Sequence, residues 1–270
     1  MPAQSHFARS VWGIDPENFP SYFAELATSG HTAVEVGTPT DPAEADTLRQ
    51  LAADHGLQVI AQIWTIGTTP DEHLASAHPQ LEIALRLAPV LINSHTGKDH
   101  FPVSENATII RGMQDHLSKL DPETLLVHET HRGRATFTAH LTSQLLSLVP
   151  EMQLCLDISH WTCVHESLLE DQSPAVDLAI SRTRYLHARL GGTQTPQLHP
   201  PLDPAYQTER ETFLTWWKRW IIQENAAQRP TYIATEYGPF PYAPPSTITN
   251  QEKALSEHNA STRKFVASIF

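Results

Sequence analysis

Four ionisable side chains occupy comparable positions in four apolar segments of the chain. Glu129 ends LLVHE, Asp157 ends LCLD, His187 ends RYLH and Glu236 ends YIATE. Burying an unpaired charge costs roughly several kcal/mol, so buried ionisable groups are paired, neutralised or bound to a cation. Three carboxylates and one imidazole suit a divalent ion such as Mn, Mg, Co, Fe or Zn. The pattern therefore predicts one divalent metal site.

Each of these residues also has a simpler explanation. Asp157 could accept hydrogen bonds at the start of a following helix, as strand-end aspartates often do. His187 could be a core histidine whose ring nitrogens are satisfied by neighbours. Four such residues, in sequence order and at one level, are harder to explain by capping alone. We therefore favour the metal site.

The segments that carry these residues belong to a longer repeat. Eight apolar, β-rich segments occur along the chain, at 8–13, 32–37, 57–64, 88–95, 124–130, 152–159, 184–191 and 231–238. Segments with helical patterns follow them, for example 41–55 and 137–148. Alternating strands and helices indicate βαβ units and a parallel sheet. Eight units in 270 residues predict a (β/α)8 TIM barrel, with residues 1–270 as one domain.

Composition and motifs narrow the class of protein. The chain has no GxGxxG or GxxxxGK[ST] motif, which disfavours an open nucleotide-binding sheet. It has no apolar run of about 18 residues and no secretory leader, and Cys155 and Cys163 make no disulfide framework. We expect a cytoplasmic protein with no membrane partner. The net charge of −12 argues against nucleic acid as a partner.

Two segments rich in Gly and Pro interrupt the repeat. Residues 191–204 and 238–250 follow the seventh and eighth strands, so both lie on the carboxyl face of the barrel. They are expected to form a lid or wall over a site, or alternatively a contact in a homo-oligomer. The helix that contains FLTWWKRWII (213–222) has one apolar face, which we expect to pack on the barrel or on a second subunit.

The ordered motifs resemble those of the xylose-isomerase-like TIM barrel superfamily, whose members are sugar phosphate isomerase/epimerase-like. The superfamily also includes inosose and dehydroshikimate dehydratases and endonuclease IV. Its pattern is a Glu ending strand five, D-x-x-H on strand six, a His or Gln on strand seven and a Glu ending strand eight. Here the matching residues are Glu129, Asp157-Ile-Ser-His160, His187 and Glu236.

The resemblance implies a role for each matched residue. Glu129, Asp157, His187 and Glu236 would bind the metal. Glu129 and Glu236 would also move a proton on opposite sides of a substrate carbon, with His160 as a third catalytic residue. His131 and Arg189, in the E-x-H and H-x-R elements, would bind substrate, and Arg132 in the segment after Glu129 is a further candidate. Trp12, Gln62 and His95 end strands at the expected mouth and could contact substrate or serve packing alone. Glu35 and Trp64 also end strands at the expected mouth.

Some features depart from the superfamily pattern. The segment THRGR carries Arg132 and Arg134, which could hold a substrate carboxylate or phosphate, or face solvent. Asn93 and His95 end the fourth strand, as one metal-binding place of the trinuclear endonucleases requires. The D-x-H expected soon after His187 is missing. Together with the negative charge, that absence argues against a nuclease.

Three functions are consistent with this sequence. The first is a metal-dependent isomerase or epimerase acting on a small polyhydroxy carbonyl compound through an enediolate. The second is a metal-dependent dehydratase or other lyase acting on a cyclic polyol acid, which arginines would anchor. The third is a barrel that binds a metabolite without catalysis. The first is favoured by the two glutamates together with His160, and the third is disfavoured because a competent residue fills each expected ligand position.

Overall fold

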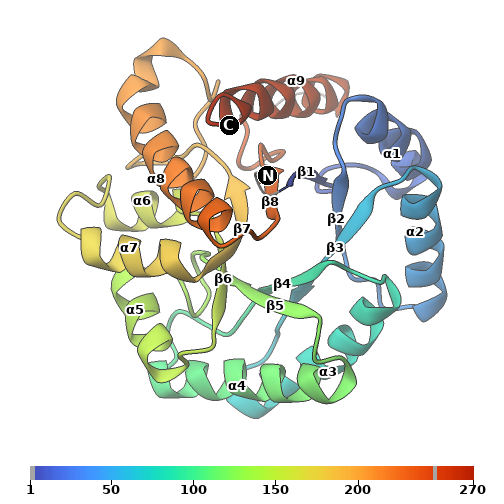
Figure 1. Cartoon of the computed structure of the whole chain (residues 1–270), viewed down its shortest axis with the longest axis vertical. Helices are drawn as coiled ribbons and strands as arrows, with labels where there is room; N and C mark the ends of the chain where they lie inside the picture. Colours follow the sequence, from blue (N-terminus) through green and yellow to red (C-terminus); the bar gives the residue numbers. More distant parts are fainter. Residues whose placement is uncertain (1–3, 246–247) are drawn as a thin grey trace.

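Eight parallel strands form a closed barrel in the computed structural model, which describes residues 4–245 and 248–270 (Figure 1). The strands are β1 (Ser5–Ser10), β2 (Ala33–Gly37), β3 (Gln58–Trp64), β4 (Leu91–His95), β5 (Leu125–Glu129), β6 (Gln153–Leu156), β7 (Thr183–Ala188) and β8 (Thr231–Thr235). Each strand pairs with the next, and β8 pairs with β1 to close the ring. The predicted TIM barrel is confirmed.

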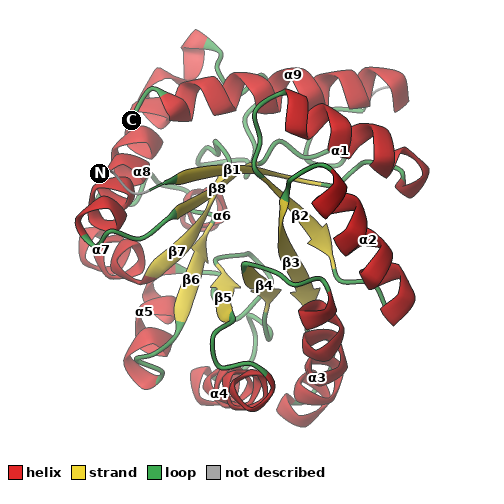
Figure 2. Ribbon diagram, turned by 45° about the vertical axis from the view of Figure 1, so that its right-hand side comes forward, coloured by secondary structure: helices red, strands yellow, loops and turns green. Residues whose placement is uncertain are grey.

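Helices surround the barrel and cover its outer face (Figure 2). They are η1 (Pro16–Asn18), α1 (Phe19–Thr28), α2 (Pro42–Asp54), α3 (Pro70–Arg86), α4 (Val103–Leu120), α5 (Ala139–Leu148), α6 (Ser159–His165), α7 (Ser173–Arg182), η2 (Pro204–Tyr206), α8 (Gln207–Ala226) and α9 (Ile248–Ala267). Side-chain caps define several starts: Asp41 accepts from the backbone N–H of Ala43 at α2, and Thr69 accepts from that of Glu72 at α3. No helix within the described residues is long and apolar enough to span a membrane.

Some element boundaries differ from those expected. The first strand is Ser5–Ser10 rather than 8–13, because its pairing with β8 begins at Ser5. The sixth strand ends at Leu156, since Asp157 already turns the chain into α6. Helices α6 and α7 follow this strand, where the sequence pattern gives no particular residue range for a helix. The assignment of residues 1–270 to one domain stays a prediction.

The barrel interior is built in layers. An apolar layer consists of one residue from each strand: Ala8, Ala33, Ile60, Leu91, Val127, Cys155, Tyr185 and Ala234. Side chains alternate along a strand, so the residue two positions further on points inward, one layer nearer the carboxyl ends. Those residues are Ser10, Glu35, Gln62, Asn93, Glu129, Asp157, His187 and Glu236. We call these eight residues the polar layer.

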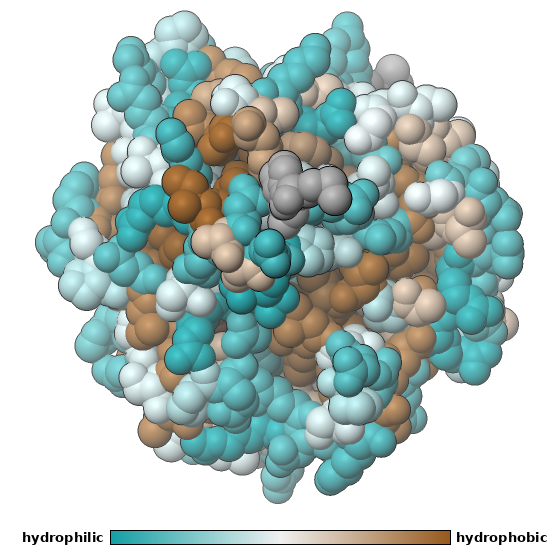
Figure 3. All heavy atoms as spheres, in the orientation of Figure 1, coloured by the Kyte–Doolittle hydropathy of each residue, from teal (hydrophilic) through white to brown (hydrophobic). Residues whose placement is uncertain are grey.

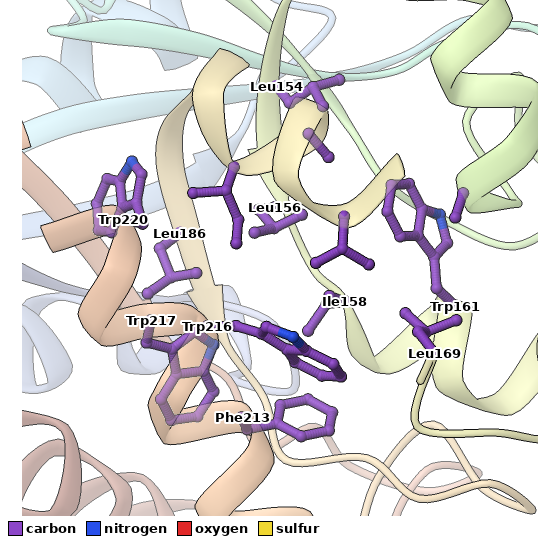
Figure 4. Close-up of a cluster of buried hydrophobic side chains, with 14 of the residues drawn as sticks. Leu154, Leu156, Ile158, Trp161, Leu169, Leu186, Phe213, Trp216, Trp217 and Trp220 are labelled. Atoms are coloured by element: carbon purple, nitrogen blue, oxygen red, sulfur yellow. The ribbon is translucent and has the colours of Figure 1, made fainter. Parts of the chain in front are cut away.

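A second core lies between β6, β7 and helix α8 (Figure 4). The apolar face of α8 contributes Phe213, Trp216, Trp217 and Trp220, all buried. The indole N–H of Trp220 also donates to the Thr183 carbonyl at 3.0 Å. The tryptophan-rich face therefore packs on the barrel, as one of the two expected arrangements requires.

Replacing Trp217 with alanine should test this packing. Trp217 is fully buried, so Trp217→Ala should lower the free energy of unfolding by about 3–5 kcal/mol. Ile222 on the same helix is 58% exposed, and Ile222→Ala should change it by less than about 0.5 kcal/mol. Urea unfolding measures both. Equal effects would contradict the assigned packing.

Candidate active site

A cavity of about 420 Å³ opens at the carboxyl ends of the strands, directly above the polar layer. Its lining consists of Ser10, Val11, Trp12, Gly37, Gln62, Trp64, His95, Glu129, His131, Arg134, Arg189, Glu236 and Tyr242. The space-filling view shows the outer surface of the molecule, where hydrophilic residues cover much of the visible face and hydrophobic residues lie between them (Figure 3). The cavity thus combines an apolar wall with ionisable groups at its floor.

Each of three carboxylates has one oxygen held by a protein donor. The Oδ1 atom of Asp157 accepts from the Ser159 backbone N–H at 3.1 Å and from its hydroxyl at 2.5 Å. The Oε1 atom of Glu236 lies 2.5 Å from Arg189 Nη2. The Oε2 atom of Glu129 accepts from the Asn93 amide at 2.8 Å. These contacts fix the orientation of all three groups.

The second oxygen of each carboxylate faces the same region. His187 Nδ1 lies 2.7 Å from Glu236 Oε2 and 3.7 Å from Glu129 Oε1. Asp157, His187 and Glu236 each offer a ligand atom within 4.8 Å of the other two. Asp157 Oδ2, His187 Nδ1 and Glu236 Oε2 are buried and make no hydrogen bond of good geometry to the described residues. Buried polar atoms left in this way call for an explanation, such as a catalytic role or a bound water or ion.

Arg189 places a positive charge beside two carboxylates of the polar layer. Its Nε atom lies 3.1 Å from Asp157 Oδ2, and its Nη2 atom pairs with Glu236. Burial alone would raise the pKa of Glu236, but Arg189 and His187 outweigh it and hold that pKa at about 2. Burial raises the pKa of Asp157 to about 7 despite Arg189. At Asp157, the effects of burial and of the neighbouring carboxylates on the pKa therefore outweigh the effect of the Arg189 guanidinium.

His187 and Glu129 also influence each other. Burial would lower the pKa of His187, but Cys155, Glu236 and Glu35 outweigh it and raise that pKa well above its ordinary value. Burial would raise the pKa of Glu129, yet His95 and His187 hold it well below its usual range. His187 and Glu129 therefore each favour the charged form of the other.

Three further imidazoles line up beside Glu129. The ring centroids of His95 and His131 are 4.5 Å apart, and those of His131 and His160 are 3.9 Å apart. His95 Nε2 lies 3.0 Å from Glu129 Oε2, and His95, Glu129 and His131 form a second group of close ligand atoms. Burial, followed by the charge of His95, lowers the pKa of His131 to about 3, so His131 is neutral near pH 7.

The arginines of the THRGR segment diverge. Arg134 lines the cavity and donates to the Thr65 carbonyl at 3.0 Å. Arg132 points the other way, with its guanidinium 4.7 Å from the centre of the Tyr242 ring and 3.2 Å from His160 Nδ1. Neither forms an ion pair with the residues that the structure describes. The two arginines therefore do not make one anion site.

Aromatic side chains form the wall of the cavity. Trp12 follows β1, Trp64 ends β3, and Tyr242 belongs to the segment after β8. Tyr242 lies edge-on to Trp12 at 5.0 Å, and the Arg189 guanidinium is 4.6 Å from its ring centre. Gly238 lies so close to Trp12 that a Cβ there would meet the indole at 2.1 Å. Segment 238–245 therefore closes one side of the mouth.

The structure brings most of the expected residues together. Among the cavity-lining residues are the candidates Trp12, Gln62, His95, Glu129, His131, Arg189 and Glu236. Asp157, His160 and His187 lie beneath them and are buried, whereas Arg132 lies beside the wall. The capping explanation for Asp157 also holds, because its Oδ1 atom binds Ser159. Sequence reasoning did not single out Tyr242 or Ser159; the aromatic residue in a Gly/Pro-rich loop was the available signal for Tyr242.

Comparisons with known proteins agree with this architecture. A sequence model of the family described as xylose isomerase-like TIM barrel matches residues 23–198. The chain therefore belongs to the xylose isomerase-like TIM barrel family, as its motifs indicated. A comparison with curated proteins finds no match.

Solved structures share the fold at low sequence identity. A xylose isomerase domain containing protein from Salmonella typhimurium is 14% identical, with 99% of each chain covered and a TM-score of 0.67. Endonuclease IV from Thermus thermophilus is 16% identical, with 98% of this chain and 99% of that chain covered and a TM-score of 0.61. A probable 3-DHS dehydratase from Bacillus anthracis is 11% identical, with 95% and 98% covered and a TM-score of 0.59. These likenesses show the fold and leave the reaction open.

Removing the buried guanidinium should expose the excess of negative charge. Arg189→Met in metal-free protein should lower the free energy of unfolding by about 3–5 kcal/mol, because buried carboxylates lose their partner. Arg219→Met, which breaks the exposed pair with Asp177, should cost no more than about 1 kcal/mol. Denaturant titrations after dialysis against a chelator compare them. Similar losses would show that Arg189 does not carry the assigned charge balance.

Proposed function

We propose that the protein is a divalent-metal-dependent isomerase or epimerase that acts on a small polyhydroxy carbonyl compound. One observation carries the proposal. Asp157 and Glu236 each have one oxygen fixed by a protein donor and the other left without a hydrogen bond of good geometry beside His187 Nδ1. Glu129 joins them through the contact of its Oε1 atom with the same nitrogen.

The donor set fits a hard or borderline divalent ion. Glu129, Asp157, His187 and Glu236 offer three carboxylate oxygens and one imidazole nitrogen, which suit Mn, Mg, Co or Zn. When bound, such an ion polarises a carbonyl group and stabilises the negative charge of an enediolate. It would also offset the negative charge that Arg189 leaves uncompensated.

The two glutamates are the proposed proton carriers. Glu129 and Glu236 both line the cavity, and they come from β5 and from the end of β8. In an epimerisation, one carboxylate accepts the proton from the substrate carbon, and the other, as a carboxylic acid, returns a proton to the opposite side of that carbon. In an isomerisation, the proton returns to the neighbouring carbon. Positioned acid–base groups of this kind contribute roughly 10²–10⁴-fold to a rate.

The remaining side chains would bind and orient the substrate. Arg189 and the neutral His131 face the cavity and would hold substrate oxygens. His160 is fully buried behind them, with Nε2 3.5 Å from Asp157 Oδ2, so its proposed catalytic part is exerted at that carboxylate. Trp12 and Trp64 would cover an apolar face of the substrate and exclude water.

We also propose a cytoplasmic location and a small-molecule substrate. The net charge of −12 disfavours nucleic acid, although endonuclease IV has the same fold. A small compound also suits the cavity, whose volume of about 420 Å³ is typical of metabolite sites.

A dehydratase acting on a cyclic polyol acid is the second candidate. Arg134 favours it, because this guanidinium lines the cavity without an ion-pair partner among the described residues. A substrate carboxylate would supply the missing charge. The same proton abstraction would then be followed by loss of water, and the conjugated product would absorb in the ultraviolet.

Proton exchange in heavy water tests the proposed function. With Mn²⁺ present, deuterium should enter a carbon next to the carbonyl of at least one compound in a panel of ketoses and keto-polyols. Chelation should abolish the exchange and added Mn²⁺ should restore it. Absence of exchange with every metal and compound would contradict the proposal. A metal-free protein that binds a compound as tightly as the loaded one would instead indicate a non-catalytic binding barrel.

Removing either proton carrier should stop turnover without unfolding the protein. Glu129→Gln and Glu236→Gln should each lower kcat by about 10²–10⁴-fold, because an amide cannot accept the proton. Glu44→Gln, on the exposed side of α2, should leave kcat unchanged. Steady-state assays on the substrate found by exchange measure this, with circular dichroism to verify folding. Near-normal turnover in both site variants would exclude the assigned roles.

A further inference from the structure

Glu35 is a buried carboxylate that the proposed reaction does not use. It lies in the middle of β2, belongs to the polar layer and is 1% exposed. No arginine or lysine pairs with it among the described residues, where its one ion pair is with His187. A buried, ionisable group with a single imidazole partner is costly, and an apolar residue of similar volume would often be more stabilising. Its presence needs a reason other than core stability.

The contacts of Glu35 lead directly to the proposed metal ligands. Its Oε2 atom lies 3.3 Å from His187 Nε2. The opposite ring nitrogen, Nδ1, is the one that faces Glu236 and Glu129. The imidazole therefore lies between Glu35 on one side and the ligand carboxylates on the other.

Glu35 is also linked to a second ligand. The Asn93 amide donates to Glu35 Oε1 at 3.1 Å and to Glu129 Oε2 at 2.8 Å. One amide group thus spans the two carboxylates. A change at Glu35 would release the Asn93 side chain, which holds Glu129 in its present orientation.

Glu35 does not itself belong to any group of close ligand atoms found among the described residues. Cys155 is the other acceptor near the His187 ring, and a thiol is a weak acceptor compared with a carboxylate. The distance of 3.3 Å is longer than an ideal N–H···O bond and its geometry falls short of one, so the contact between Glu35 and His187 is an ion pair.

From this arrangement we infer that Glu35 is a positioning residue that selects the metal-binding nitrogen of His187. By accepting from the Nε2–H group, Glu35 would leave Nδ1 as the nitrogen that gives up its proton to bind the ion, and through Asn93 it holds Glu129 in its present orientation. Histidine ligands commonly donate their other ring N–H to a carboxylate, and loss of such a partner weakens metal binding by roughly 10–100-fold. The inference rests on the proposed metal site, but it predicts a ring contact that exists without metal.

Metal affinity gives the first test. Mn²⁺ binding, followed by the electron paramagnetic resonance signal of the free ion, should weaken by about 10–100-fold in Glu35→Leu. Glu35→Gln should lose less, since its amide oxygen can still accept from Nε2, and it covers the case in which the leucine variant does not fold. The matched control is Glu224→Gln, which alters another fully buried glutamate, paired with Arg184 and Arg229 far from the cavity. Its Mn²⁺ affinity should stay at the wild-type value.

Nuclear magnetic resonance of ¹⁵N-histidine-labelled, metal-free protein gives the second test. The solvent-protected Nε2–H of His187, distinguished from Nδ1–H by its ring ¹⁵N correlations and assigned by its absence from His187→Gln, should be present in the wild type and lost in Glu35→Leu. If the N–H resonance persists unchanged in Glu35→Leu, or if Glu224→Gln weakens Mn²⁺ as much as Glu35→Leu does, the inference is overturned. A wild-type protein that binds no Mn²⁺ but loses the N–H in Glu35→Leu would contradict the proposed function while supporting the Glu35 contact.

Discussion

The polar layer concentrates more negative charge than its own cations offset. Glu35, Glu129 and Asp157 are buried and Glu236 is nearly so, and their side chains project into the barrel, where solvent screens their repulsion only weakly. Arg189 forms ion pairs with Asp157 and Glu236, and a protonated His187 forms one with Glu35. Burial is the main cause of the raised pKa of Asp157, and the neighbouring Glu236 and Glu129 raise it further. The proposed divalent ion would offset the negative charge of these carboxylates.

The scaffold and the chemistry are separable in this protein. The barrel fold is shared with solved structures of a xylose isomerase domain containing protein, an endonuclease IV and a probable dehydratase. A barrel hosts different reactions by changing the loops at its carboxyl face. In this chain those loops bring Trp12, Arg134 and Tyr242 to the cavity, so the choice of substrate is expected to depend on them rather than on the polar layer.

Much of the fold and part of the site could be predicted because β-strands have a period of two. Once the strand ends were recognised, Glu129, Asp157, His187 and Glu236 were expected at a comparable level. In the register of the sheet Glu129 lies opposite Cys155 and His187 opposite Ala234, so Asp157 and Glu236 lie further along the chain, and their ligand atoms nevertheless come close to His187. Boundaries were less accessible: α6 begins at Ser159 without a linker, and no residue pattern separated it from β6. Loop side chains were hardest to place. Arg132 and Arg134 are two residues apart, yet the Arg132 guanidinium contacts the Tyr242 ring and the Arg134 guanidinium contacts the Thr65 carbonyl. Only tertiary contacts determine this difference.

The two carboxylate oxygens of Asp157 have different roles, and this affects what a substitution at this position would do. One of its oxygens organises the start of α6 through Ser159, while the other faces the cluster around His187. An asparagine keeps an oxygen for the first duty and gives up the negative charge needed for the second. Substitution of Asp157 by asparagine could thus abolish the proposed metal-dependent reaction while the barrel still folds. Such a change would be a short evolutionary route from an enzyme to a sensor or carrier with the same fold.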